Sequence, residues 1–221
     1  MYVGGIPAVG TDALAGLGVV FPITLIVSAF SSLVGMGGAP LASIFLGERR
    51  KNDAERVFNA GAVLLVLFGV CLTAVVLAAG DPLVRLFGAP DSSFSYASEY
   101  LFVYGTGTLF VMLSLGLNPF ITAQGYSFTS MATVAIGAVL NIALDPLFIF
   151  AFGMGVRGAA LATVLSQGIS ALWVTLFFFR KKSQFRFRRK YFFPQAKTVG
   201  RMLLLGLSPF IMSVTESAIQ I

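Results

Sequence analysis

The sequence predicts an all-α integral membrane protein, and three observations lead to this fold class. The chain of 221 residues is 57% hydrophobic and only 11% charged, whereas a soluble domain carries about 25% charged residues. Its uncharged stretches are long enough for membrane-spanning helices, each of which needs roughly 20 apolar residues. Lys and Arg gather on alternate connections between these stretches, which is typical of a protein that crosses a membrane several times.

The uncharged stretches predict five complete spans and the start of a sixth. We expect them at about residues 14–38, 57–80, 99–123, 128–152 and 157–179, with the sixth beginning near Met202. The third and fourth spans share one uncharged stretch, from Tyr100 to Leu144, that is too long for a single helix across a bilayer. The short polar turn at residues 124–127 divides this stretch in two.

The distribution of Lys and Arg predicts how the chain is oriented. Of its 15 cationic residues, four lie in the connection 47–56 and nine in the connection 180–201. Successive connections alternate between the two sides of a membrane, so these two share a side, which the positive-inside rule identifies as the cytoplasm. We therefore expect a multi-pass protein of the cell inner (plasma) membrane with loops 47–56 and 180–201 in the cytoplasm.

The basic run at residues 180–190 has two interpretations. It is compatible with a nucleic-acid-binding segment, but Lys and Arg beside a span more commonly fix the topology and attract anionic lipid. Phe185 and Phe187 stand between the cations, which favours a segment lying in the membrane interface. We therefore expect the lipid bilayer to be the partner of this run and expect no nucleic acid.

Glycine and proline inside the expected spans indicate helices that pack closely and bend. Small residues let helix backbones approach where lipid offers no hydrophobic drive for association. A proline frees the carbonyl four residues before it and kinks the helix. Prolines lie in or near the spans at Pro22, Pro40, Pro119, Pro146 and Pro209. We expect Pro22 and Pro146 to serve as hinges of the kind that a transporter needs.

The segment NIALDPLFIF, residues 141–150, places a carboxylate inside an apolar run. Asn141 and Asp145 are four residues apart and therefore share one helix face, and Pro146 frees a backbone carbonyl in the same turn. Such oxygen atoms suit a hard cation or a proton held on the acid. An ionisable residue at membrane depth marks an ion or proton path by default. Alternatively, Asp-Pro ends the span and Asp145 faces the outer headgroups, although residues 147–152 remain apolar.

Five segments, in order, resemble a known family of membrane transporters. They read DALAGLGVVFPI, GMGGAPLASIFLGE, LGLNPFITAQG, GAVLNIALDPLFIF and GVRGAALATVLSQ. On these motifs the chain resembles, over essentially its whole length, the bacterial multidrug exporters of the multidrug and toxic compound extrusion (MATE) family. The family fold has twelve helices in two six-helix lobes around a central cavity.

The resemblance implies that this chain is truncated from such a twelve-helix transporter. Residues 1–180 would form the N-terminal lobe, with the tail of helix 1 followed by helices 2 to 6. Residues 181–200 would form the basic cytoplasmic loop between the lobes. Residues 201–221 would begin the C-terminal lobe with most of helix 7.

The resemblance also implies a cation or proton site in the N-terminal lobe. The family uses an Asp on helix 1, an Asn and an Asp one turn apart on helix 5, and a Thr on helix 6. Asn141 and Asp145 match the helix 5 pair, and Thr163 matches the helix 6 Thr, so these three would hold H+ or Na+. The helix 1 Asp would lie before Met1.

Three more residues are candidates for the cavity of the transporter. Some family members use a Glu on helix 7, and Glu216 is the candidate for that role. Gln167 and Tyr104 are candidates to line the cavity, and for each the alternative is a hydrogen bond between helices.

The function implied by the resemblance is efflux by antiport. The protein would export organic cations and lipophilic drugs in exchange for H+ or Na+, as a monomer when full length. It would not be an enzyme, would have no catalytic residue, and would need no cofactor besides the coupling ion.

Other functions remain as alternatives. A lipid-linked precursor flippase of the same superfamily would need cations in its cavity, but apart from Arg157 at a span edge none lies within a span. A non-functional fragment is a further alternative. An intramembrane aspartyl protease needs two membrane aspartates, and Asp145 is the single one available.

Overall fold

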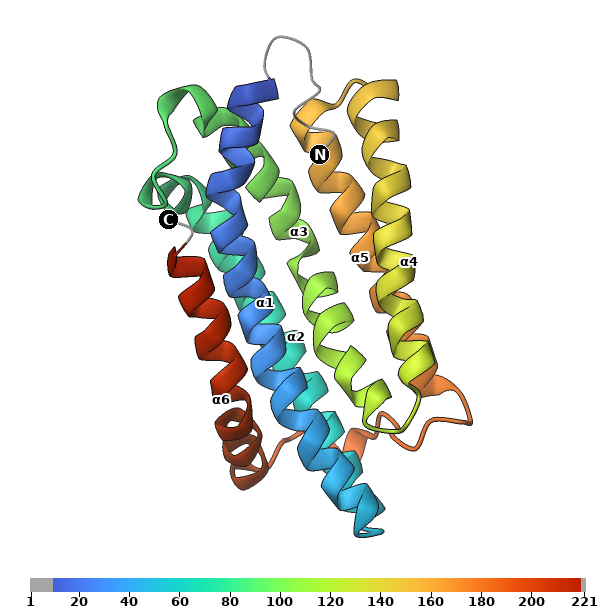
Figure 1. The fold of residues 1–221 in the computed structure, drawn as a ribbon. Helices are drawn as coiled ribbons and strands as arrows, with labels where there is room; N and C mark the ends of the chain where they lie inside the picture. Colours follow the sequence, from blue (N-terminus) through green and yellow to red (C-terminus); the bar gives the residue numbers. More distant parts are fainter. Residues whose placement is uncertain (1–9, 220–221) are drawn as a thin grey trace.

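The computed structural model describes residues 10–219 and consists of six long helices (Figure 1). These are α1 (Gly10–Gly47), α2 (Lys51–Leu86), α3 (Asp91–Thr122), α4 (Ser127–Pro146), α5 (Gly155–Phe179) and α6 (Ala196–Ile219), with the short π-helix η2 (Leu147–Ala151) and the 3-10 turn η3 (Arg189–Tyr191) between them. All six are long and apolar enough to cross a membrane. The predicted all-helical membrane fold is therefore confirmed over the described residues. The expected tail of helix 1, in residues 1–9, lies outside them.

Helices α1, α2 and α3 extend well beyond the spans that were expected from the gaps between charges, whereas α4 with η2 and α5 match their spans within two residues. With 38 residues and a rise of 1.5 Å per residue, α1 is about 57 Å long, compared with a hydrocarbon layer of about 30 Å. The ends that project past this layer carry the charged residues, as in the first turns of α2 at residues 51–56. For the same reason α6 begins at Ala196, upstream of the start expected near Met202.

Close approach of backbones joins α1 to its neighbours in the bundle. This helix packs against α2, α3 and α6, while α3 also packs against α5, and α4 packs mainly against α5 (Figure 1). A Cβ atom on Gly35 of α1 would lie 2.6 Å from the carbonyl oxygen of Gly116 in α3. Such contacts leave no room for a side chain, so glycine at these positions lets the helices pack as closely as the sequence predicts.

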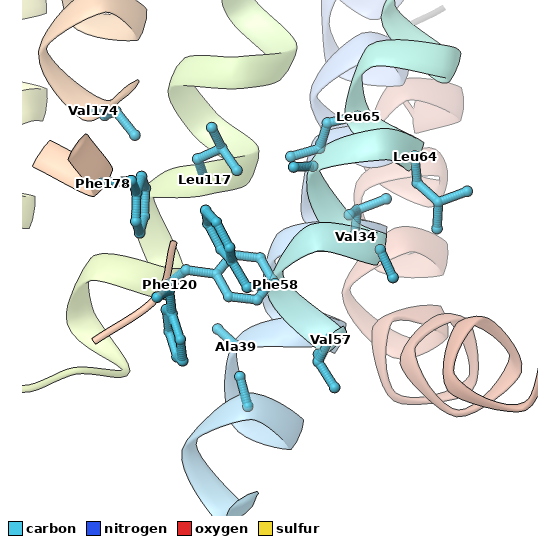
Figure 2. Packing of buried hydrophobic residues seen from close by; sticks show 14 of the residues in the cluster. Val34, Ala39, Val57, Phe58, Leu64, Leu65, Leu117, Phe120, Val174 and Phe178 are labelled. Carbon is cyan, nitrogen blue, oxygen red and sulfur yellow. The ribbon is translucent and has the colours of Figure 1, made fainter. Parts of the chain in front are cut away.

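Both cation-rich connections lie at one end of the bundle, which we call the basic end (Figure 1). An aromatic cluster fills the interior there and includes Phe58 of α2, Phe120 of α3 and Phe178 of α5 (Figure 2). The ring centroid of Phe58 lies 4.4 Å from that of Phe178 and 5.4 Å from that of Phe185. Phe185 is completely buried. Phe185 therefore packs inside the bundle, whereas Phe187 is 37% exposed. The interfacial position of the segment stays a prediction.

Two buried amides explain why Phe185 turns inward. The segment 180–195, which we call the connecting segment, contains little regular structure, so its backbone groups need other partners. The side-chain oxygen of Gln124 accepts hydrogen bonds from the Ser183 hydroxyl (3.1 Å) and from the Gln184 N–H (2.6 Å). Asn59 of α2 holds the backbone of Arg186 and Arg188 by hydrogen bonds in the same way. The connecting segment is thus attached to the bundle at defined points.

The prolines affect the helices in different ways. Helix α1 continues through Pro22, and the carbonyl oxygen of Pro22 accepts a 2.9 Å hydrogen bond from the Ser217 hydroxyl of α6. Non-helical backbone occurs in α2 at Ala79 (φ −122°, ψ 20°), shortly before Pro82. This bend lies at a position that was not among the expected hinges. The roles of Pro22 and Pro146 as hinges stay predictions.

Candidate functional site

Asn141, Asp145 and Thr163 lie together where α4 meets α5. The side-chain nitrogen of Asn141 donates to the Asp145 carboxylate at 3.4 Å and to the Thr163 hydroxyl oxygen at 3.3 Å. All three side chains are half-buried. The α4 pair shares a face because its members are four residues apart, whereas Thr163 reaches the cluster through the packing of α5 on α4.

A change of helix type follows Asp145 directly. Pro146 has no N–H and ends the α-helical part of α4. The chain continues as the π-helix η2, in which the N–H of Phe152 donates to the carbonyl of Leu147 at 3.0 Å. Single π turns in α-helices are frequent at functional sites. Helical structure therefore extends for more than a turn past Asp145, up to Ala151, which favours its placement within the span.

The hydrogen bonds in the cluster are long and leave several oxygen lone pairs free. N–H···O bonds usually measure 2.7–3.2 Å, so the Asn141 amide is loosely held. The Thr163 hydroxyl donates to the carbonyl of Ala159 at 3.0 Å, which leaves its lone pairs to face Asn141. Rotating the amide by half a turn would add its own oxygen to those of Asp145 and Thr163. This oxygen set fits a proton on the carboxylate or a small hard cation.

Tyr100 of α3 lies beside the cluster, and it was not among the residues expected there. The side chain of Tyr100 lies near those of Thr163 and Asp145. The ring also stacks on Tyr104, with centroids 6.2 Å apart and planes at 16°. Tyr104 is only 4% exposed and belongs to the hydrophobic core, so it supports Tyr100 from behind. The spacing of these two tyrosines, four residues apart, is the one signal that could have drawn attention to Tyr100.

A polar cavity of about 240 Å³ extends from the cluster toward the basic end, between α3, α4 and α5. Its lining residues are Ser114, Leu115, Asn118, Thr133, Val134, Gly137, Ala138, Asn141, Thr163, Ser166, Gln167 and Ser170. Side-chain oxygens of Asn118, Ser166 and Gln167 are buried there without a protein partner. Buried polar atoms of this kind are usually satisfied by water. We therefore expect water and small ions to reach Asn141 through this cavity.

Other polar features lie apart from this cluster. A larger cavity of about 610 Å³ at the opposite end is lined by residues including Asp81, Glu99 and Arg157. Its charges are already partnered, because Arg157 pairs with Glu99 at 3.1 Å and the Ser98 hydroxyl donates to Asp81. Glu216 is exposed on α6, and that helix packs on α1 and α2. Within residues 10–219, Glu216 is therefore not part of the Asp145 cluster.

Comparisons with known proteins agree with this architecture. The multidrug export protein MepA of Staphylococcus haemolyticus (strain JCSC1435) is 28% identical to this chain over 201 residues. The alignment covers 91% of this chain and 44% of MepA, so the chain spans slightly less than half the length of this relative.

Solved structures of a multidrug resistance MATE family transporter of the MOP superfamily also match. An inward-facing structure aligns with 95% of this chain and an outward-facing structure with 98%, each at a TM-score of 0.90 and 28% identity. This chain covers 48% of the transporter in both cases.

The family model for MatE matches residues 1–147, which is more than half of the sequence. The match includes Asn141 and Asp145, and the structure adds the six membrane-crossing helices that a multi-pass transporter requires. The chain therefore belongs to the MATE family.

Proposed function

We propose that the full-length protein is a multidrug efflux antiporter of the plasma membrane. It exports organic cations and lipophilic drugs in exchange for H+ or Na+, which binds at Asn141, Asp145 and Thr163. The observation that carries this proposal is the meeting of an intramembrane carboxylate with polar groups of a second helix beside a polar cavity. Membership in a family whose relatives include a multidrug export protein supports the same activity.

In the proposed mechanism, Asp145 serves the ion and the drug in turn. Binding of H+ or Na+ neutralises the carboxylate and replaces the long hydrogen bonds that Asn141 makes to Asp145 and Thr163. The contact between α4 and α5 then changes, neighbouring helices bend with the help of Pro22, and drug is released outward. Drug binding favours the deprotonated or ion-free state. Each ligand lowers the affinity for the other, which is the coupling that an antiporter needs.

The charge of the cavity lining suits the passage of a cation such as the coupling ion. The lining of the polar cavity contains no Lys or Arg in the part of the chain that the structure describes. A flippase for lipid-linked pyrophosphate would need such cations, so their absence from the described lining argues against this alternative. The efflux experiment distinguishes the two functions. The protein is proposed to work as a monomer, with the basic end in the cytoplasm because the cation-rich connections gather there.

The proposal is tested by ethidium efflux from cells that express the full-length protein. We compare the wild type with Asp145→Asn, which keeps the size of the side chain but removes its charge. The wild type should extrude ethidium when a proton or sodium gradient is imposed and should lose this activity when the gradient is collapsed. Asp145→Asn should insert normally and show no gradient-driven efflux.

A matched control is Asp91→Asn, because Asp91 is an exposed carboxylate at the start of α3, away from the cluster. It should retain efflux. Normal efflux by Asp145→Asn would remove the coupling role from this residue. A well-inserted wild type without any efflux would overturn the drug-export proposal and favour the flippase. Imposing the two gradients separately identifies the coupling ion.

A further inference from the structure

An apolar groove with a cationic rim lies at the basic end, between α2 and the connecting segment. Its volume is about 430 Å³. It is lined by Asn59, Ala62, Val63 and Val66 of α2 and by Phe187, Arg188, Arg189 and Phe192 of the connecting segment. The α2 residues recur at the spacing that places side chains on one helix face, so a single stripe of α2 forms one wall.

The apolar part of the groove is continuous with the outer surface of the bundle. Val66 is 44% exposed and Phe192 is 63% exposed. One turn further along the same stripe, Val70 is 54% exposed. Apolar side chains that are exposed on a membrane helix face lipid tails, so an acyl chain can enter the groove from the bilayer without leaving an apolar surface.

The cationic rim is held in place by buried polar groups. The oxygen of the Asn59 amide accepts from the N–H of Arg188 at 2.9 Å, and its nitrogen donates to the carbonyl of Arg186 at 2.9 Å. The Nε atom of Arg188 lies 2.6 Å from the carboxylate of Glu55, which is 1% exposed. This contact is an ion pair without hydrogen-bond alignment, since both Glu55 oxygens lack a hydrogen-bond partner. It still fixes the guanidinium beside the groove.

The charge next to this anchored arginine is not neutralised. Arg189 is exposed, and it has no ion pair with any carboxylate of residues 10–219. The terminal nitrogens of Arg188 also have no hydrogen-bond acceptor in this part of the chain. Guanidinium groups with free donors in a fixed orientation bind phosphate well.

We propose that this groove binds one anionic phospholipid of the inner leaflet. The phosphate and the charged headgroup contact Arg188 and Arg189, and an acyl chain lies along the stripe from Ala62 to Val70. The two arginines attract an anionic headgroup, so charge complementarity selects an anionic lipid. They also repel the organic cations proposed as transport substrates. The apolar wall selects a lipid over a soluble phosphate. The bound lipid joins α2 to the connecting segment and so links membrane composition to the position of this segment.

The site is tested with the purified full-length protein by native mass spectrometry. The protein is titrated with phosphatidylglycerol and, in parallel, with phosphatidylcholine. The first variant is Arg189→Gln, and its control is Arg186→Gln, which removes the same charge from the same segment but from outside the groove. The second variant is Val66→Trp, which fills the groove from an exposed position, with Val75→Trp as a control on the same helix.

The wild type should bind phosphatidylglycerol in preference to phosphatidylcholine. Arg189→Gln should weaken phosphatidylglycerol binding about fivefold, as expected for one cation near a headgroup. Val66→Trp should also weaken the binding of the first phosphatidylglycerol molecule. Both controls should bind like the wild type. Equal losses in Arg186→Gln and Arg189→Gln would overturn the site in favour of diffuse attraction. Unchanged binding by Val66→Trp, or equal binding of both lipids, would also overturn it.

Discussion

Gly206 of α6 lies so close to Leu33 of α1 that a Cβ atom on Gly206 would come within 1.9 Å of the Leu33 carbonyl oxygen. The obstacle is backbone, which cannot move aside as the end of a flexible side chain can. Any larger residue at this position must therefore push α6 away from α1. In a bilayer, contacts between helices depend on such packing because burial from water contributes little.

Gly206→Ala should destabilise the packing of α6 on α1. Overpacking of this kind costs about 1–3 kcal/mol, so the purified protein should unfold at a lower temperature in detergent. Gly200→Ala is the matched control, since a Cβ atom there meets nothing within 4 Å. It should leave the unfolding temperature unchanged or raise it slightly, because Ala favours helix over Gly. Equal unfolding temperatures for the two variants would contradict the close contact.

Thr163→Val should weaken the binding of the coupling ion without unfolding the protein. The substitution keeps the shape of the side chain but removes the hydroxyl that Asn141 contacts at 3.3 Å. Removing this oxygen should weaken the free energy of ion binding by about 1–1.5 kcal/mol. The ion concentration at half-maximal efflux should therefore rise about five- to tenfold. Thr163→Ser should stay close to the wild type. The control is Thr175→Val, whose hydroxyl bonds within its own helix, and a shift as large in this control would argue against a specific role for Thr163.

Asn59→Ala should release the connecting segment from α2. The substitution leaves the Arg188 N–H and the Arg186 carbonyl without their partner, and each unsatisfied group costs about 1–3 kcal/mol. The many Lys and Arg of the connecting segment make trypsin a sensitive probe of this release. Cleavage within residues 180–190 should be faster in Asn59→Ala than in the wild type. Asn52→Ala changes an exposed residue in the first turn of α2 and should be cleaved like the wild type; faster cleavage there too would refute the anchoring role.

Gln167→Leu should slow ion exchange while leaving drug binding intact. The side-chain oxygen of Gln167 is buried in the polar cavity without a protein partner, so its removal makes the cavity less favourable for water. Gradient-driven ethidium efflux should become slower, whereas equilibrium binding of ethidium to the purified protein should be unchanged. Gln167→Asn keeps the amide and should be closer to the wild type. If Gln167→Leu transports at the normal rate, the cavity is not the ion path.

Several features of this protein follow from the sequence alone. Gaps between charged residues, together with the polar turn at residues 124–127, located five membrane helices and the start of a sixth, because a charge is costly in hydrocarbon and the chain must keep such groups outside it. The spacing of Asn141 and Asp145 placed both on one helix face, since that relationship depends on helical geometry and nothing else. The family resemblance linked Thr163 to them, and no local sequence pattern could have supplied this link.

Other features were decided by the tertiary structure. The packing of α3 on α5 brings Tyr100 near Thr163, and Phe185 is buried because Gln124 turns the connecting segment inward. Both outcomes depend on partners far away in the sequence. In a water-soluble helix the polar and apolar faces would hint at such contacts, but in a lipid-facing helix both faces are apolar and this signal is lost. The closeness of backbones, set by pairs such as Gly35 and Gly116, then determines which side chains meet.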